Sequence, residues 1–183
     1  MPPHVDQQLQ EKILKAAQRL WRMRGEEGLT LRSVAKEAGT TTPTVYKRFR
    51  NKEALRAALA ERFREQLNEH LFGAKSLEDV CRRYLEFAEK HQHEYQLLLR
   101  SWSDILHPDF PQPGRVWLMT KFAERFGGKA EDYSRCFYAL FLLSHGAATL
   151  LTLPAESSAR DEIRSHFLGI AETIIKQNRY FRG

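Results

Sequence analysis

The sequence predicts an all-α protein of about nine helices. Apolar residues recur at spacings of three and four along most of the chain, as they do on one face of a helix. Glycines, prolines and helix-capping residues separate these segments, and no segment shows the alternation typical of a strand. With 183 residues, 42% of them hydrophobic, the chain can bury a core in one or two domains.

The first helix is expected from about residue 8 to Arg24, because an apolar face ends where Gly25 and Gly28 follow. Its apolar positions are Leu9, Ile13, Ala16, Leu20 and Met23.

Residues 30–56 predict two short helices and the start of a third. Thr30 is expected to cap a helix over residues 31–38, and Gly39 allows the left-handed turn that ends it. Thr41 is expected to cap a second helix over residues 42–49, with Pro43 in its first turn, where a missing N–H costs little. Asn51 then precedes a long helix to about residue 72.

The remaining helices are expected at residues 76–91, 93–106, 115–126, 130–153 and 156–178, with a Pro-rich loop at 107–114. The first three helices need a small core of their own, which we assign to Ile13, Ala17, Leu20, Val34, Ala38, Val45 and Phe49, with Leu55 from the fourth helix.

The outward positions of the segment 41–48 suit a helix that enters the major groove of DNA. Side chains with hydroxyl, aromatic and cationic groups read base edges or hold phosphates. Lys52 stands at a helix N-terminus, where unpaired N–H groups favour an anion. The resulting candidate contacts are Arg32, Thr41, Thr42, Thr44, Tyr46, Lys47, Arg48 and Lys52. Each alone could equally be a solvated surface residue, and the combination carries the prediction.

Positive charge is concentrated at the same end of the chain. Residues 1–56 hold 12 Lys and Arg against 6 Asp and Glu, whereas residues 57–183 hold 17 of each kind. A positive field confined to one end favours docking of a polyanion there.

The segment resembles the N-terminal signature of the tetracycline-repressor (TetR) family of transcriptional regulators. The matching residues are Leu31-Arg32-Ser33-Val34-Ala35, Ala38-Gly39, Thr40-Thr41, Thr44-Val45-Tyr46, Phe49 and Lys52-Glu53-Ala54-Leu55. The resemblance covers roughly residues 8–56. An acidic residue is common in the family where Ser33 stands, so the reciprocal capping of the second helix is expected to be incomplete.

This resemblance implies a helix-turn-helix DNA-binding domain at residues 1–51 and a helical regulatory and dimerisation domain at residues 52–183. It also implies base or phosphate contacts at Thr42, Pro43, Thr44, Tyr46, Lys47, Arg48 and Lys52. A palindromic operator needs two such readers at half-sites one or more helical turns apart, so a homodimer is expected. We expect a repressor that a small effector releases.

The same resemblance implies dimerisation through the last two long helices. Small residues and an apolar stripe on these helices support it, and the expected interface residues are Ser144, Ala148, Ile163, Phe167, Ile170 and Ile174. The alternative is that these residues pack only on their own chain.

Aromatic residues are frequent in the same region, and an aromatic cavity with a few polar groups is typical of small-molecule sites. We expect a hydrophobic or aromatic effector there, with Tyr84, Phe87, Trp102, Trp117, Phe122, Phe137, Phe141 and His145 as candidate lining. For any single aromatic residue, plain core packing is the commoner role.

Other function classes fit less well. The sequence contains no Gly-rich phosphate loop, no nucleophile elbow, and no His, Cys or carboxylate set with metal-ligand spacing, so we expect neither an enzyme nor a metal or other cofactor. No run of eighteen apolar residues or secretory signal is present, and the two isolated cysteines, Cys81 and Cys136, suit a reducing cytoplasm. A helical protein-interaction adaptor that lacks DNA binding is the remaining alternative.

Overall fold

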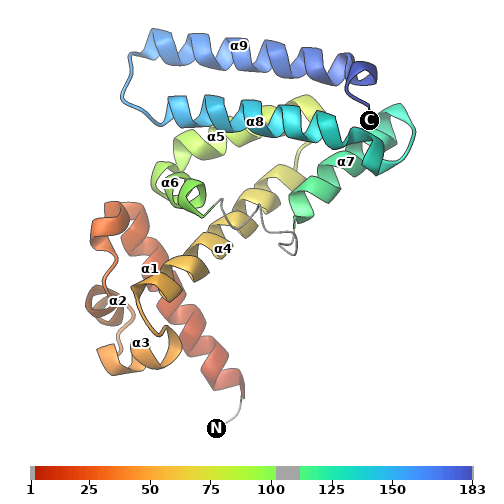
Figure 1. The fold of residues 1–183 in the computed structure, drawn as a ribbon. Helices are drawn as coiled ribbons and strands as arrows, with labels where there is room; N and C mark the ends of the chain where they lie inside the picture. Colours follow the sequence, from red (N-terminus) through yellow and green to blue (C-terminus); the bar gives the residue numbers. More distant parts are fainter. Residues whose placement is uncertain (1–2, 102–111, 183) are drawn as a thin grey trace. The chain divides into compact units, whose positions relative to one another are not determined.

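The computed structural model describes residues 3–101 and 112–182, with side chains from Gln7 onward (Figure 1). Within these residues all regular structure is helical, which confirms the predicted all-α class. Trp102 and residues 107–111 of the predicted loop 107–114 lie outside the described residues.

The chain forms two compact units. The first unit contains residues 1–65 and 93–103, and the second contains residues 66–92 and 104–183. The first unit comprises α1 (Pro3–Gly28), α2 (Leu31–Glu37), α3 (Thr42–Arg48), most of α4 (Lys52–Phe72), and α6 (Gln92–Arg100). The second comprises the end of α4, α5 (Leu77–Lys90), α7 (Pro113–Phe126), α8 (Ser134–Leu151) and α9 (Ser157–Lys176), with short 3-10 turns η2 (Ala130–Tyr133) and η3 (Asn178–Tyr180). The expected boundary between functional domains at residues 51 and 52 stays a prediction.

The first unit has the small core that the apolar pattern predicted. All eight expected side chains are buried: Ile13, Ala17, Leu20, Val34, Ala38, Val45, Phe49 and Leu55. These residues come from four helices, so α2 packs on α1 and α3 packs on α2 through apolar contacts, and their other faces remain free for solvent or a partner.

Backbone geometry at Gly25 ends the regular part of α1. Gly25 has φ 57° and ψ −143°, a conformation that residues with a side chain adopt only at a cost. The chain therefore turns sharply near the end predicted for the first helix, and residues 26–28 form a last short helical turn.

The N-caps of α2 and α3 are the residues predicted from the sequence, and one further prediction about the cap of α2 needs correction. Thr30 and Thr41 are the N-caps, and their hydroxyls accept from the backbone N–H groups of Ser33 and Thr44. The reciprocal cap of α2 is complete, because the Ser33 hydroxyl also accepts from the Thr30 N–H at 3.1 Å. The expectation of an incomplete cap was wrong, because a serine hydroxyl reaches that N–H as a carboxylate does.

Helix α6 is attached to α1 by polar contacts. The Trp21 indole N–H donates to the His93 carbonyl oxygen at 2.8 Å. Arg22 forms an ion pair with Glu94 at 2.6 Å, and the Glu94 side chain is almost fully buried. Because these groups lose water when they pack, their mutual contacts are needed to keep α6 in place.

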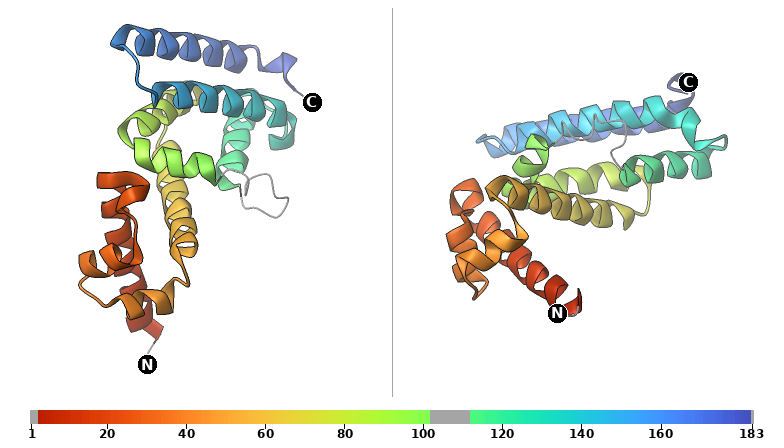
Figure 2. Two further views of the ribbon diagram at one scale, coloured as in Figure 1. Left: turned by 60° about the vertical axis from the view of Figure 1, so that its left-hand side comes forward. Right: turned by 60° about the horizontal axis from the view of Figure 1, so that its bottom comes forward.

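In the second unit, α5, α7, α8 and α9 surround a core with many rings, and Figure 2 shows α8 and α9 running side by side. Two helix boundaries differ from the prediction. Helix α7 begins at Pro113 rather than Arg115, because proline is well suited to the first helical turn. The predicted helix 130–153 is divided into η2 and α8, and the buried Tyr133 hydroxyl donates to the Gly127 carbonyl oxygen at the junction.

Both cysteines, Cys81 and Cys136, are free and buried, as expected. Burial raises the pKa of the Cys81 thiol to about 12, so it stays protonated and unreactive near neutral pH.

Candidate nucleic-acid interface and aromatic cluster

The exposed face of α3 carries the predicted DNA contacts. Val45 and Phe49 point into the core, which leaves the opposite side of this seven-residue helix outward. Tyr46 is 54% exposed, and Pro43 and Lys47 are exposed as well. Thr42, Thr44 and Arg48 are half-buried. The fold therefore presents an aromatic ring and a cation on one short helix, with hydroxyls at its start.

Thr41 is also the N-cap of α3, as its position in the sequence predicted. Its hydroxyl accepts from the Thr44 N–H at 3.3 Å and lies 2.8 Å from the Thr44 hydroxyl. The pair fixes the first turn of α3, so Thr41 acts on the interface by orienting that turn.

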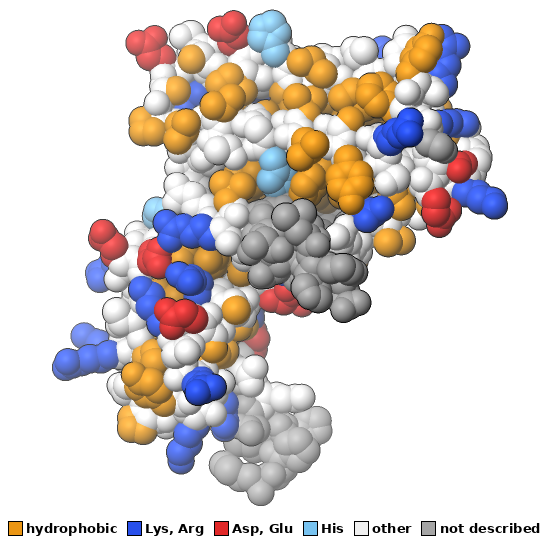
Figure 3. Space-filling model, in the orientation of Figure 1, with side chains coloured by type: hydrophobic (Ala, Val, Ile, Leu, Met, Phe, Trp, Pro, Cys, Tyr) orange, Lys and Arg blue, Asp and Glu red, His pale blue; other side chains and the backbone are white. Residues whose placement is uncertain are grey.

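Two further predicted contacts flank α3. Arg32 is exposed on α2. Lys52 begins α4, whose N-terminal turn is capped by the Asn51 side chain, and the Lys52 ammonium donates to the Glu26 carbonyl oxygen at 3.4 Å. Lys52 is thus held between the end of α1 and the start of α4. Figure 3 shows Lys and Arg side chains distributed over the surface of this part of the chain.

A carboxylate that sequence reasoning missed organises the cations beside Lys52. Glu26 pairs with Arg56 of α4 at 3.2 Å and with Arg100 of α6. The hydrogen bond from Arg100 is the main cause that lowers the pKa of Glu26, which keeps it ionised near neutral pH. The sequence offered no signal for this cluster, because its partners lie 30 and 74 residues away.

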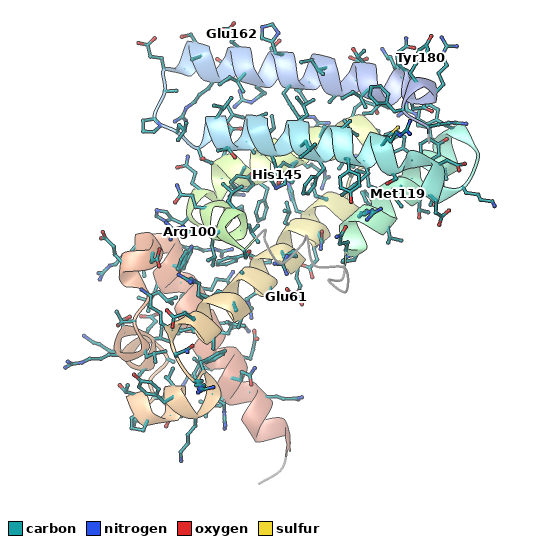
Figure 4. The ribbon with its side chains drawn as sticks, in the orientation of Figure 1. Glu61, Arg100, Met119, His145, Glu162 and Tyr180 are labelled. Atoms are coloured by element: carbon teal, nitrogen blue, oxygen red, sulfur yellow. The ribbon has the colours of Figure 1, made fainter. Side chains whose placement is uncertain are left out.

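The predicted ligand-pocket residues fall into several places in the second unit. Four of them form a row: the ring of Phe137 stacks on Phe141, Phe141 lies against His145, and Tyr84 follows, with centroid separations of 5.4, 4.4 and 5.3 Å. Figure 4 shows His145 on the side of α8 that faces α5, the helix that carries Tyr84. We call Phe137, Phe141, His145 and Tyr84 the aromatic row.

Hydrogen bonds fix the end of this row. The His145 Nδ1 lies 3.0 Å from the Phe141 carbonyl oxygen, which makes it the donor nitrogen. The Nε2 atom is then free to accept from the Tyr84 hydroxyl at 3.0 Å. Burial lowers the pKa of His145 to about 4, so the imidazole is neutral at pH 7.

The other candidates lie elsewhere. Phe122 is fully buried and stacks on Tyr133 with centroids 5.2 Å apart, which is a core position. Phe87 packs between His70 and His91. Trp102 lies outside the described residues.

Trp117 lines an open groove of about 490 Å³ between α7 and the start of α5. Leu77 and Val80 supply apolar lining, and the Glu78–Arg125 ion pair, at 2.9 Å, joins the two helices beside the groove. The sequence prediction did not include this groove, because its lining comes from a loop and two helices far apart in the chain.

The six residues predicted for a dimer interface are divided by their burial. Ser144, Ala148, Phe167 and Ile174 are buried within their own unit, and their place in an interface stays a prediction. Ile163 is half-buried and Ile170 is 49% exposed. Apolar residues at helical spacing cover both the inner face of a helix and the edge of that face, so the predicted set contains buried as well as exposed side chains.

Other large apolar side chains are exposed on the same two helices. Tyr138, Leu142 and Leu150 follow one another at the spacing of a single α8 face, and Figure 3 shows hydrophobic side chains gathered along α8 and α9. A side chain added at Gly146 or Gly169 would meet nothing within 4 Å.

Within the described part of the chain, no three His, Cys, Asp or Glu side chains are grouped as metal ligands. No helix in the same residues is long and apolar enough to cross a membrane.

Comparison with known proteins agrees with this geometry. Residues 13–59 match the sequence profile of the bacterial regulatory proteins of the tetR family. A search of curated proteins gave no match.

Solved structures with similar folds cover nearly the whole chain. A protein of unknown function from Rhodococcus sp. RHA1 is 25% identical, with a TM-score of 0.65 over 92% of this chain and 94% of that one. TetR from Acinetobacter baumannii AYE is 16% identical, with a TM-score of 0.68 over 93% and 96% of the two chains. A TetR-like transcriptional regulator from Rhodococcus sp. RHA1 is 17% identical, with a TM-score of 0.61 over 98% of each.

The profile match covers the helix-turn-helix, and the fold matches cover both units. Residues 13–59 therefore match the tetR family of bacterial regulatory proteins, and the chain as a whole shares the fold of the solved TetR and TetR-like structures.

Proposed function

We propose that this protein is a DNA-binding transcriptional regulator of the TetR family, a repressor that binds a palindromic operator as a homodimer and is released by a small hydrophobic or aromatic effector in the cytoplasm. The observation that carries the proposal is the outward face of α3, where Tyr46 and Lys47 are exposed next to the capped first turn. A short helix fixed from behind by Val45 and Phe49 is the geometry in which side chains read a major groove.

The contacts divide into two roles. Thr42, Pro43, Thr44 and Tyr46 lie in the first five residues of α3 and are proposed to meet base edges and methyl groups. Lys47, Arg48, Arg32 and Lys52 are proposed to hold phosphates, so each should release counterions on binding. We expect repression because a dimer bound over a promoter blocks that promoter sterically, and this needs no further binding surface on the protein.

A second copy is proposed to bind the exposed apolar face of α8 and α9. The residues that support this are Tyr138, Leu142, Leu150, Ile163 and Ile170, together with Gly146 and Gly169, where the backbone is accessible. A twofold axis through this face places the same surface of both chains in contact. The dimer is mechanically required, since a palindrome offers two equivalent half-sites.

The effector is proposed to bind beside the aromatic row. It acts by differential affinity: it favours a spacing of the two readers that differs from the spacing favoured by the operator. Helix α4 is the proposed link, because one uninterrupted helix contains both Lys52 and the residues that pack in the second unit.

Selection of bound duplexes from a random pool by the purified protein tests the proposal. The expected product is an inverted repeat, with affinity that decreases steeply as salt rises, by about 0.9 log units per tenfold salt for each phosphate neutralised. Enrichment of no duplex in dilute buffer would contradict DNA reading, and enrichment of a single half-site would contradict the symmetric dimer.

The dimer has its own test. Leu142→Arg and Ile170→Arg each put a charge on the proposed face, and we expect sedimentation to show a monomer for both. Val116→Arg is the matched control, because Val116 is 60% exposed on α7 and outside this face. A dimer that persists in both face variants would exclude this interface.

A further inference from the structure

Beside the aromatic row lies an arginine that has no acidic partner among the described residues. Arg115, in the first turn of α7, is half-buried. Its guanidinium carbon lies 5.9 Å from the ring centre of Phe137 and 5.2 Å from that of Tyr138. Among the described residues its only hydrogen-bond partner is the Ser134 hydroxyl, at 3.4 Å, and its Nε atom is buried without a partner. A guanidinium with five donors is thus left largely unsatisfied.

Several other arginines of the described structure have acidic partners. Arg22, Arg62, Arg83, Arg125 and Arg164 each form an ion pair with a carboxylate at 2.6 to 3.1 Å. Arg115 instead contacts two rings and one hydroxyl. Removing a guanidinium from water without an anion is costly, so a partner from outside the chain would recover that cost.

The start of α7 adds to the positive character. Gln112, the N-cap of this fourteen-residue helix, makes no side-chain cap, and Pro113 occupies the first turn. Helix N-termini attract anions through their unpaired N–H groups. Within the aromatic row itself, His145 is neutral near pH 7, so Arg115 supplies the cation.

The row also sets the shape of a ligand. Phe137, Phe141 and His145 occupy successive turns of one face of α8, and eight residues of helix rise about 12 Å. Rings line this length, Arg115 stands at one end, and the Tyr84–His145 hydrogen bond stands at the other. The surface therefore suits an elongated apolar molecule with an anion at one end.

We propose that the effector is a hydrophobic or aromatic carboxylate about 12 Å long, whose carboxylate binds Arg115 while its apolar part lies along Phe137 and Phe141. This inference rests on the proposed effector-released function and specifies its ligand class. Guanidinium matches a planar carboxylate through two parallel hydrogen bonds, which a lysine cannot reproduce.

A matched pair of fluorescent probes tests the role of charge. 1-Anilinonaphthalene-8-sulfonate and N-phenyl-1-naphthylamine share one ring system and differ by the sulfonate. We expect Arg115→Gln to weaken binding of the anionic probe about tenfold or more, as for loss of a charged hydrogen bond, and to change binding of the neutral probe less than about twofold. Arg115→Lys should weaken binding of the anionic probe by an intermediate factor, because lysine keeps the positive charge but lacks the parallel N–H donors of the guanidinium.

Arg135→Gln is the control, since Arg135 is exposed on the adjacent helix α8. Binding of the neutral probe reports whether each variant is folded, and Arg115→Met, which keeps the packed methylenes, repeats the test if Arg115→Gln does not fold. Equal losses for both probes, no loss for either, or many weak sites per chain would overturn the carboxylate proposal.

Competition with 4-phenylbutyrate and with 4-phenylbutan-1-ol extends the test to a carboxylate. The acid is expected to displace the anionic probe at lower concentration than the alcohol, and this advantage should disappear in Arg115→Gln. DNA retention by Arg115→Gln without probe should match the parent chain. A parent chain that binds no duplex would contradict the regulator, while unaltered probe binding in Arg115→Gln would contradict only the ligand class.

Discussion

The two units of this chain are stabilised in different ways. In the first unit, ion pairs join segments far apart in the sequence, such as Arg22 with Glu94 and Arg62 with Glu11. The second has such pairs as well, Arg125 with Glu78 and Arg164 with Glu89, and adds series of contacting rings such as the aromatic row. The difference teaches that ion pairs between distant segments hold helices together in both units, whereas contacts between rings shape the interior of the second.

The reading face itself should show the largest effect. Tyr46→Ala combined with Lys47→Glu removes an aromatic contact and reverses a phosphate contact, so we expect operator affinity to decrease by about 100-fold or more. Both side chains are exposed, so the melting temperature should change little. Fluorescence anisotropy with labelled operator measures the loss. Lys90→Glu, at an exposed position on α5, is the control, and equal affinity of the double variant and the control would remove α3 from the interface.

The polar attachment of α6 is the next contrast. Glu94→Ala removes the almost fully buried partner of the Arg22 guanidinium, which is itself partly exposed, and we expect the free energy of unfolding to fall by about 1 to 2 kcal/mol. The control is Glu37→Ala, which breaks the exposed Arg19–Glu37 pair and should cost less than about 1 kcal/mol. Urea denaturation measures both. Similar costs for the two variants would show that burial does not distinguish these pairs.

The aromatic row should show a dependence on pH. The pKa of His145 is about 4 in the folded chain and close to 6.5 when unfolded, so the unfolded chain binds more protons between these values. Stability is then full above about pH 6.5 and decreases as pH falls toward 4. In His145→Phe, the difference in unfolding free energy between pH 7.5 and 4.5 should be smaller by about 2 kcal/mol. Denaturant titrations at the two pH values provide the measurement, and an unchanged difference would mean that His145 titrates normally.

The smallest expected effect is at the cap of α2. Ser33→Ala removes the hydroxyl that bonds the Thr30 N–H and the Gly28 carbonyl oxygen, which should cost about 1 kcal/mol. Ser33→Glu restores a reciprocal cap and should recover most of the loss. Thermal unfolding of the three chains compares them, and a destabilised glutamate variant would show that the Gly28 contact matters more than the cap.

Local signals explain why the first unit could be predicted in detail. Thr30, Gly39, Thr41 and Asn51 each specify a helix end through atoms within a few residues, and the structure confirms these ends. The buried Val45 and Phe49 follow from helical spacing, and the outward face follows from them.

The second unit could not be predicted at that level, because its geometry arises from distant contacts. Tyr84 and His145 are 61 residues apart, and no sequence pattern indicates that they meet. Helical spacing grouped Phe167 and Ile174 with Ile170, although only the last is exposed. Periodicity identifies an apolar face, but it cannot distinguish a face that packs on its own chain from one that is left for a partner.

One close contact near the start of α7 limits what the chain can accommodate. A Cβ atom on Gly114 would lie 2.8 Å from the amide oxygen of Asn68 on α4, so the Asn68 side chain would have to turn aside before residue 114 could carry even one methyl group. Inherited changes at residue 114 are thus coupled to the rotamer of a residue on another helix.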